Sequence, residues 1–170
     1  LDVPIDYTDE NSAMTSLYLT KHMATDSSQR IGTLLVNPGG PGFGGSFLAE
    51  SAANIYSPTL LKSFDIIAWD PRGTGQSIPA IDCTADYDYF FAAGDITPDT
   101  DQERAEGIAT YKEFTDLCFE KNGDLLPYVG TNNSARDMDM IRRALGEDKI
   151  SYFGFSYGSE LGATWATLFP

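Results

Sequence analysis

A serine flanked by glycines, standing between a strand pattern and a helix pattern, constrains this sequence more than any other feature. Residues 150–155 form a short apolar run, an apolar helical pattern follows over 157–169, and residues 154–158 read Gly-Phe-Ser-Tyr-Gly. So sharp a turn forces Ser156 into a strained backbone conformation with its hydroxyl exposed. Side chains two positions away on either side would collide, so Gly154 and Gly158 clear the space. The pattern therefore predicts a nucleophilic serine in this segment, which we call the elbow.

The alternative is a glycine-rich turn that carries a serine by chance, because Gly-x-Ser-x-Gly alone is a common pattern. The strand before the elbow and the helix after it favour the functional interpretation. The start of that helix would place the Tyr157 N–H, with the partial positive charge of a helix N-terminus, beside a developing oxyanion.

A second glycine-rich segment follows an earlier apolar strand. Residues 31–36 predict a buried strand, and residues 37–42 read Asn-Pro-Gly-Gly-Pro-Gly; we call them the glycine loop. An oxyanion hole needs a second backbone N–H from a neighbouring loop, and Gly39 and Gly40 both fit this role. Gly40 is our first choice because Pro41 fixes the chain after it. A phosphate-binding loop is the alternative, but the lysine of the P-loop motif is absent from the sequence.

Asp70 ends another apolar strand pattern, 64–69, and is followed by a turn that contains Arg72. It is either a catalytic acid or a structural residue that holds the turn with Arg72. We favour the structural role, because the acid of a catalytic triad in this type of fold follows the serine.

The single histidine, His22, lies on a predicted early strand, 16–23. A serine hydroxyl needs a base, which is usually histidine. The expected chain order puts that base after the nucleophile, so we interpret His22 as a structural or surface residue.

Strand and helix patterns alternate along the chain, which is typical of an α/β fold whose mostly parallel sheet has helices on both faces. The length of 170 residues suits one domain. We expect Thr131 or Asn132 to cap the helix that ends at Gly146, with a glycan on Asn132 as the weaker reading of Asn-Asn-Ser. The expected strands are 16–23, 31–36, 64–69 and 150–155; the expected helices are 44–56, 101–121, 131–146 and 157–169, with an irregular acidic segment over 78–100.

The composition of the chain limits the classes of molecule that it is expected to bind. The formal net charge of −14 disfavours nucleic acid and anionic membrane surfaces, and no apolar run is long enough to span a bilayer. We expect no metal and no cofactor, because neither cysteine belongs to a Cys-x-x-Cys or Cys/His pattern. From the residues alone, Cys83 and Cys118 are either two buried thiols or one disulfide.

Taken together, these motifs resemble one family of enzymes. The glycine loop, residues 69–77 (Trp-Asp-Pro-Arg-Gly-Thr-Gly-Gln-Ser) and the elbow are similar to the proline iminopeptidase and tripeptidyl aminopeptidase group of α/β-hydrolases. The resemblance covers nearly the whole chain, including residues 3–7. Residues 131–170 are most similar to secreted actinobacterial tripeptidyl aminopeptidases. Many proline iminopeptidases have histidine where this chain has Asn37, so the tripeptidyl branch fits better.

The resemblance implies a serine hydrolase that removes short peptides from free N-termini. Ser156 would be the nucleophile, and the Gly40 and Tyr157 amides would form the oxyanion hole. Members of the group often carry cysteines near these positions, which favours a Cys83–Cys118 disulfide and a secreted or cell-envelope location.

The resemblance also implies that residues 1–170 are the N-terminal part of one α/β-hydrolase catalytic domain. The cap, the catalytic Asp and the catalytic His would belong to a C-terminal remainder, without which we expect no activity. Two alternatives stay open: an esterase or lipase-like acyl hydrolase, and a truncated chain without catalytic function, since one fold serves many reactions.

Overall fold

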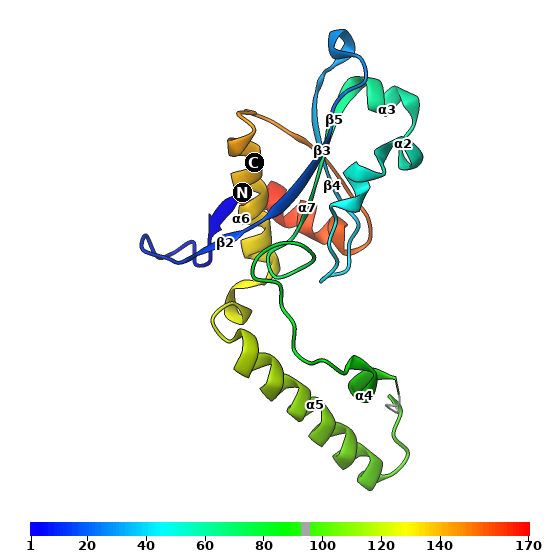
Figure 1. Cartoon of the computed structure of the whole chain (residues 1–170), viewed down its shortest axis with the longest axis vertical. Coiled ribbons are helices and arrows are strands. Elements are labelled where there is room, and N and C mark those ends of the chain that lie inside the picture. Colours follow the sequence, from blue (N-terminus) through cyan, green and yellow to red (C-terminus); the bar gives the residue numbers. More distant parts are fainter. Residues whose placement is uncertain (93–95) are drawn as a thin grey trace. The chain divides into compact units, whose positions relative to one another are not determined.

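A computed structural model describes residues 1–92 and 96–170 of the chain. The described chain forms two compact units (Figure 1). Unit 1 comprises Leu1–Ala80 and Tyr128–Pro170, and unit 2 comprises Ile81–Pro127. The glycine loop and the elbow both belong to unit 1.

The central sheet of unit 1 has the strand order β3-β5-β4-β6. Strand β4 pairs in parallel with β5 on one side and with β6 on the other, whereas β3 pairs with β5 in antiparallel orientation. The predicted class, α/β with a mostly parallel sheet, is confirmed. The strands are β1 (Asp2–Pro4), β2 (Met14–Ser16), β3 (Tyr18–His22), β4 (Gly32–Asn37), β5 (Phe64–Asp70) and β6 (Ser151–Gly154).

The early strand predicted over 16–23 corresponds to β3, except that its first residue, Ser16, ends β2, which has a different partner. β2 pairs with β1 in a separate two-stranded sheet, and β3 joins the central sheet beside β5. The change occurs at Leu17, whose N–H donates to the carbonyl of Leu1 (2.8 Å) before the chain enters β3. An apolar pattern cannot reveal such an exchange of partners, because both strands alternate with the same period.

Helices cover both faces of the central sheet, as predicted (Figure 1). Alternate residues of β4 and β5 point to opposite faces, so each strand contributes to two cores. One core joins Leu35, Ile67 and Trp69 to Ala135, Met138, Ile141, Leu161 and Trp165 of two helices. The other joins Leu34, Val36, Ile66 and Ala68 to Leu48, Ala49, Ala52, Tyr56 and Leu61.

The helices predicted over 131–146 and 157–169 are confirmed, each ending within two residues of the expected position. The helix predicted over 44–56 is two short helices separated at Ser51, and a helix that begins at Pro58 went unpredicted although Ser57 caps it by accepting the Leu60 N–H. These helices are α1 (Phe47–Glu50), α2 (Ala52–Ile55), α3 (Pro58–Ser63), α6 (Thr131–Ala144) and α7 (Tyr157–Leu168); the 3₁₀ turns are Ser27–Gln29 and Leu126–Tyr128.

The predicted cap of α6 is wrong. Gly130 occupies the N-cap position, and no side chain accepts a hydrogen bond there. The Thr131 hydroxyl lies instead 2.8 Å from the Tyr157 hydroxyl, so it links the start of α6 to the start of α7.

Unit 2 contains α4 (Tyr87–Phe91) and α5 (Asp101–Asn122). The predicted helix over 101–121 is confirmed, and it begins with a capping box formed by Thr100 and Glu103. Part of the segment predicted as irregular is α4, and residues 93–95 of that segment lie outside the described residues. A disulfide joins Cys83 to Cys118, as the resemblance implied. No residue of α5, which the structure describes throughout, is buried.

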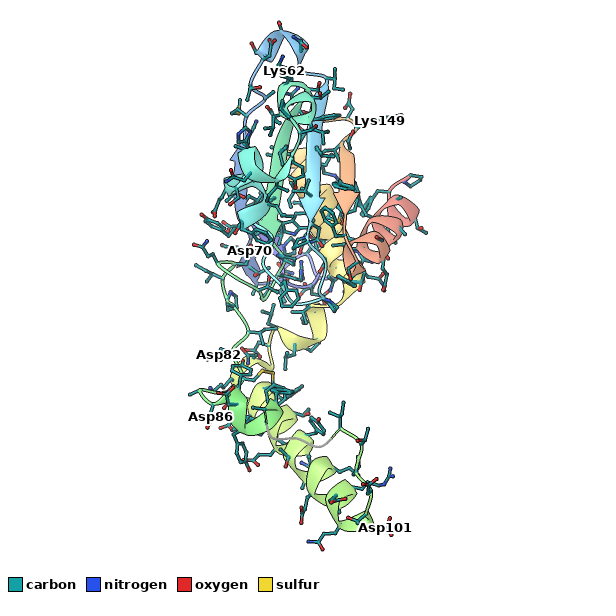
Figure 2. All side chains as sticks on the ribbon, turned by 90° about the vertical axis from the view of Figure 1, so that its right-hand side faces the viewer. Lys62, Asp70, Asp82, Asp86, Asp101 and Lys149 are labelled. Atoms are coloured by element: carbon teal, nitrogen blue, oxygen red, sulfur yellow. A yellow bond between two sulfur atoms is a disulfide. The ribbon has the colours of Figure 1, made fainter. Side chains whose placement is uncertain are left out.

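The parallel strands bring their carboxyl ends to one edge of the sheet. Figure 2 shows Asp70, which ends β5, far from Lys62 and Lys149, which precede β5 and β6. The glycine loop leaves β4 at the Asp70 edge, and the elbow leaves β6 there. Within residues 1–92 and 96–170, no helix has the length and apolar character to cross a bilayer.

Candidate active site

Ser156 has the geometry that the elbow motif predicts. Its backbone angles are φ 51° and ψ −125°, and it is the one non-glycine residue with positive φ among the described residues. A residue held in such a conformation costs about 1–3 kcal/mol, which the surrounding packing must offset. The side chain is exposed and makes no capping hydrogen bond, although Ser156 precedes the first residue of α7. The hydroxyl is therefore free to meet a substrate.

The two elbow glycines lie where side chains would collide. A Cβ atom on Gly154 would lie 2.5 Å from the carbonyl oxygen of Gly158. One on Gly158 would lie 2.9 Å from the Asn37 side-chain oxygen Oδ1. Both distances are shorter than ordinary contacts, so the turn closes this tightly only because both positions lack a side chain.

The glycine loop packs directly against the elbow. Gly39 has φ +100°, and a Cβ atom there would lie 2.6 Å from the Phe155 carbonyl oxygen and 3.3 Å from the Tyr157 nitrogen. The Gly39 N–H donates to Asn37 Oδ1 at 2.9 Å. Neither the Gly40 N–H nor the Tyr157 N–H has a hydrogen-bond partner among the described residues. The two donors predicted for an oxyanion hole are thus unengaged, on segments in close contact.

Tyr152 contacts the elbow from β6, although it belongs to none of the sequence motifs. Its hydroxyl donates to the Gly158 carbonyl at 2.8 Å, and its ring occupies the space that a side chain at position 162 would need. Burial, together with the nearby Tyr157, raises the pKa of the Tyr152 phenol, which keeps it protonated as a donor. The one available signal was Gly162, a glycine inside a helix, which often marks a close approach.

Asp70 holds the turn that follows it, as we favoured, but the predicted partnership with Arg72 is wrong, because the Arg72 guanidinium bonds to Asp137 and to the carbonyls of other segments. Its carboxylate is buried and accepts the N–H groups of Ser46 and Gln76, each at 2.8 Å. A Cβ atom on Gly44 would lie 2.8 Å from the same carboxylate, so the chain wraps closely around it. Asp70 therefore joins the turn after β5 to the start of α1.

Arg72 lies at the centre of a buried network whose other charged member, Asp137, the sequence did not reveal. Both side chains are fully buried and form a two-pronged ion pair, with Nε–Oδ2 at 2.7 Å and Nη2–Oδ1 at 2.6 Å. The remaining guanidinium N–H groups donate to the carbonyls of Pro4, Ile5 and Tyr128. All five donors of the arginine are thus satisfied, and the network ties α6 to residues near the start of the chain.

His22 lies away from the elbow. It pairs with Ile66 in β5, whereas Tyr18, at the other end of β3, pairs with Asp70 at the carboxyl edge. The strand register thus separates His22 from the edge that carries Ser156. Within the part of the chain that the structure describes, no three His, Cys, Asp or Glu side chains gather as a metal site would require.

The fold and the elbow place the chain in a known family. The model of the α/β hydrolase fold family matches residues 32–170, so the chain belongs to this family.

Several bacterial hydrolases are similar to this chain. The chain is 38% identical over 173 residues to a tripeptidyl aminopeptidase of Streptomyces lividans, which covers 99% of this chain and 32% of that protein. It is 39% identical over 175 residues to the serine protease Hip1 of Mycobacterium tuberculosis, with 100% of this chain and 33% of that protein covered. Carboxylesterase B of Mycobacterium tuberculosis is 37% identical over 147 residues, or 85% of this chain and 28% of its own length.

The resemblance to tripeptidyl aminopeptidases is confirmed by these similarities. The chain spans about a third of the length of the relatives that it matches over 99% or more of its own length. About two thirds of each of these relatives lies outside the matched region, so the activity of the whole protein is a proposal.

Proposed function

We propose that this chain supplies the nucleophile and the oxyanion hole of a serine hydrolase. The observation that carries the proposal is the backbone of Ser156. Its positive φ and exposed hydroxyl occur where a strand meets a helix, beside a glycine loop with an unengaged N–H. Backbone strain of this kind is concentrated at functional sites.

In the proposed reaction the Ser156 Oγ attacks the carbonyl carbon of the substrate, and its proton passes to a histidine base. The carbonyl oxygen becomes an oxyanion and accepts hydrogen bonds from Gly40 N–H and Tyr157 N–H. Collapse of this intermediate expels the leaving amine, which takes the proton from the histidine. Water then attacks the acyl-serine ester, its proton returns through the histidine to Ser156, and the acid product leaves.

The base and its acidic partner belong, in this proposal, to a C-terminal remainder of the same protein. The relatives are about three times as long as the matched region, which leaves room for it. His22 does not fill the role, because β3 holds it away from the elbow. Residues 1–170 would then be the N-terminal part of one catalytic domain.

The proposed substrate is a peptide with a free N-terminus, from which a short peptide, such as a tripeptide, is released. Support comes from the name of the Streptomyces relative, a tripeptidyl aminopeptidase. A secreted or cell-envelope location is proposed with it, because disulfides such as Cys83–Cys118 persist in oxidising compartments. The second candidate is hydrolysis of small acyl esters, which the similarity to a carboxylesterase favours.

The nucleophile is tested in the full-length protein with a fluorophosphonate, which labels activated serines. We expect the label on Ser156, and we expect Ser156→Ala to lower kcat about 10⁴-fold or more, as loss of a triad serine does. Ser159→Ala is the matched control, because this serine is also exposed and lies in the first turn of α7, three residues after Ser156. Near-normal turnover of Ser156→Ala would refute the assignment, and absence of any labelling would favour a chain without catalytic function.

The substrate class is tested by comparing three compounds on the wild-type protein. An aminopeptidase cleaves a tripeptidyl amide with a free N-terminus and rejects the same compound after N-acetylation. An esterase instead prefers a short acyl ester and is insensitive to the amine. Faster cleavage of the ester than of the free tripeptidyl amide would therefore favour the second candidate.

A further inference from the structure

Asn37, the last residue of β4, is the point at which the glycine loop and the elbow meet. Its residue surface is 1% exposed, so its polar side chain is held inside the protein. Its Oδ1 accepts the Gly39 N–H at 2.9 Å, and its main-chain carbonyl accepts the Phe155 N–H at 3.1 Å. One residue therefore bonds to the loop through its side chain and to the elbow through its backbone.

The same oxygen also limits how the elbow packs. Oδ1 lies 2.9 Å from the position that a Cβ atom on Gly158 would take, so Asn37 occupies the space that this glycine leaves open. The first turn of α7 is thereby seated against the Asn37 amide. The glycine that the elbow motif requires at position 158 makes room for this contact.

The glycine loop needs such an anchor because its two consecutive glycines have no side chains to restrict their backbone angles. Gly39 and Gly40 are consecutive glycines with φ +100° and +121°, and glycine has the widest conformational freedom of any residue. Each proposed oxyanion donor lies close to an atom that Asn37 holds: Gly40 follows Gly39, and Tyr157 lies two residues after Phe155. Without the Oδ1 bond, the Gly39 N–H would lose its partner and the peptide that carries the Gly40 N–H would lose its fixed direction.

We propose that Asn37 is a positioning residue, which sets the distance and direction between the Gly40 N–H and the Tyr157 N–H. The inference rests on the proposed function, since it concerns how that oxyanion hole is assembled. Asn37 acts through the two backbone donors and takes no proton in the reaction. Its effect falls on the transition state, because the oxyanion exists only after the substrate carbonyl has been attacked.

The test compares Asn37→Ala with Asn37→Ser in the full-length protein. The two variants are similar in volume, but a serine hydroxyl can accept the N–H two residues ahead, as asparagine does. We expect Asn37→Ala to lower kcat about 10- to 100-fold, less than the loss of a whole oxyanion donor. KM should change less than about twofold, because ground-state binding is not involved, and Asn37→Ser should recover most of the lost kcat.

A second pair, Asn37→Val and Asn37→Thr, keeps more of the buried volume and again differs by one hydroxyl. This second pair tests the role of Asn37 if the Asn37→Ala and Asn37→Ser variants do not fold. Equal kcat within each pair would overturn the proposal, as would a change in KM alone or failure of all four variants to fold. Fluorophosphonate labelling of Ser156 separates the two proposals: labelling that persists while the pairs behave alike refutes the role of Asn37 and leaves the nucleophile intact.

Discussion

At the scale of single residues, glycines decide how closely the loop and the elbow approach each other. Gly39 and Gly42 belong to the same loop and both have positive φ, at +100° and +93°. A Cβ atom on Gly39 would meet Phe155, Ser156 and Tyr157, whereas one on Gly42 would meet nothing within 4 Å. The two positions thus share the backbone penalty and differ in the steric one.

We therefore expect Gly39→Ala to be more damaging than Gly42→Ala in the full-length protein. Both variants should lose about 1 kcal/mol or more through the unfavourable φ. Gly39→Ala should lose a further 1–3 kcal/mol or so, because the elbow must shift to admit a methyl group. Urea unfolding measures the difference, and equal losses would contradict the close approach of loop and elbow.

At the scale of elements, a buried carboxylate near the start of β5 joins three segments. Asp65 accepts the Ala24 N–H at 2.8 Å and lies 2.9 Å from Lys21 Nζ and 3.0 Å from Arg30 Nε. Burial alone would raise the pKa of Asp65, but the Ala24, Lys21 and Arg30 contacts outweigh it and lower the pKa to about 2. The ordinary value is 3.8, so the folded state favours the charged form.

Folding stability should therefore depend on the charge of Asp65. Its contribution is complete above about pH 5 and is lost as the pH falls toward the folded pKa of about 2. We expect Asp65→Asn to lower the free energy of unfolding by about 1–3 kcal/mol at pH 7, and the difference from wild type to shrink between pH 5 and pH 2. Asp148→Asn, a change at an exposed carboxyl, serves as the control. A difference that does not vary with pH would contradict the account.

The disulfide should matter chiefly to unit 2. No residue of α5 is buried, so packing gives this helix little support, and the bond closes a loop with a sequence separation of 35. Such a loop corresponds to roughly 3–4 kcal/mol in the chain-entropy model. Reduction should speed proteolysis within residues 81–127 while the fluorescence of Trp69 and Trp165, both in unit 1, stays unchanged. Two thiols that react with an alkylating agent before any reductant is added would refute the bond.

Local sequence patterns predict some elements of this fold and miss others. The elbow and its flanks were predictable because a serine between two glycines, placed where the period changes from strand to helix, has few other uses. The helix over 44–56 was not, because Ser51 interrupts an apolar pattern that continues through it. The Arg72–Asp137 pair joins segments 65 residues apart, and no local pattern records such a pairing. The Tyr152 contact is local, six residues from Gly158, but the one sign of it in the sequence is a glycine inside a helix, Gly162.

At the scale of the whole molecule, β6 is one of the two edge strands of the central sheet, at the end opposite β3. Among the described residues its one strand partner is β4. Phe153 and Phe155 are 43% and 42% exposed, with ring centroids 4.7 Å apart. An unpaired strand edge with apolar side chains is a site at which chains associate.

We therefore expect residues 1–170 by themselves to associate and to show no hydrolysis above background, and the proposed C-terminal remainder to restore both solubility and activity. Sedimentation of the isolated chain and an assay on a tripeptidyl amide measure these properties. Phe153→Lys should reduce the association, because charge on an edge strand opposes pairing. Ile31→Lys, at an exposed apolar residue that precedes β4, should not. A stable and active monomer would contradict this view of the fold.

The strained backbone at Ser156 lowers the stability of the fold at the residue that carries the proposed nucleophile. The angle φ 51° is one that glycine adopts freely and serine does not. Exchange of this residue for glycine would relieve the strain and remove the hydroxyl in the same step. Selection for resistance to heat alone would therefore favour an inert protein, and selection for turnover would favour a less robust one. Stability and turnover are therefore opposed at a single position of the chain, residue 156.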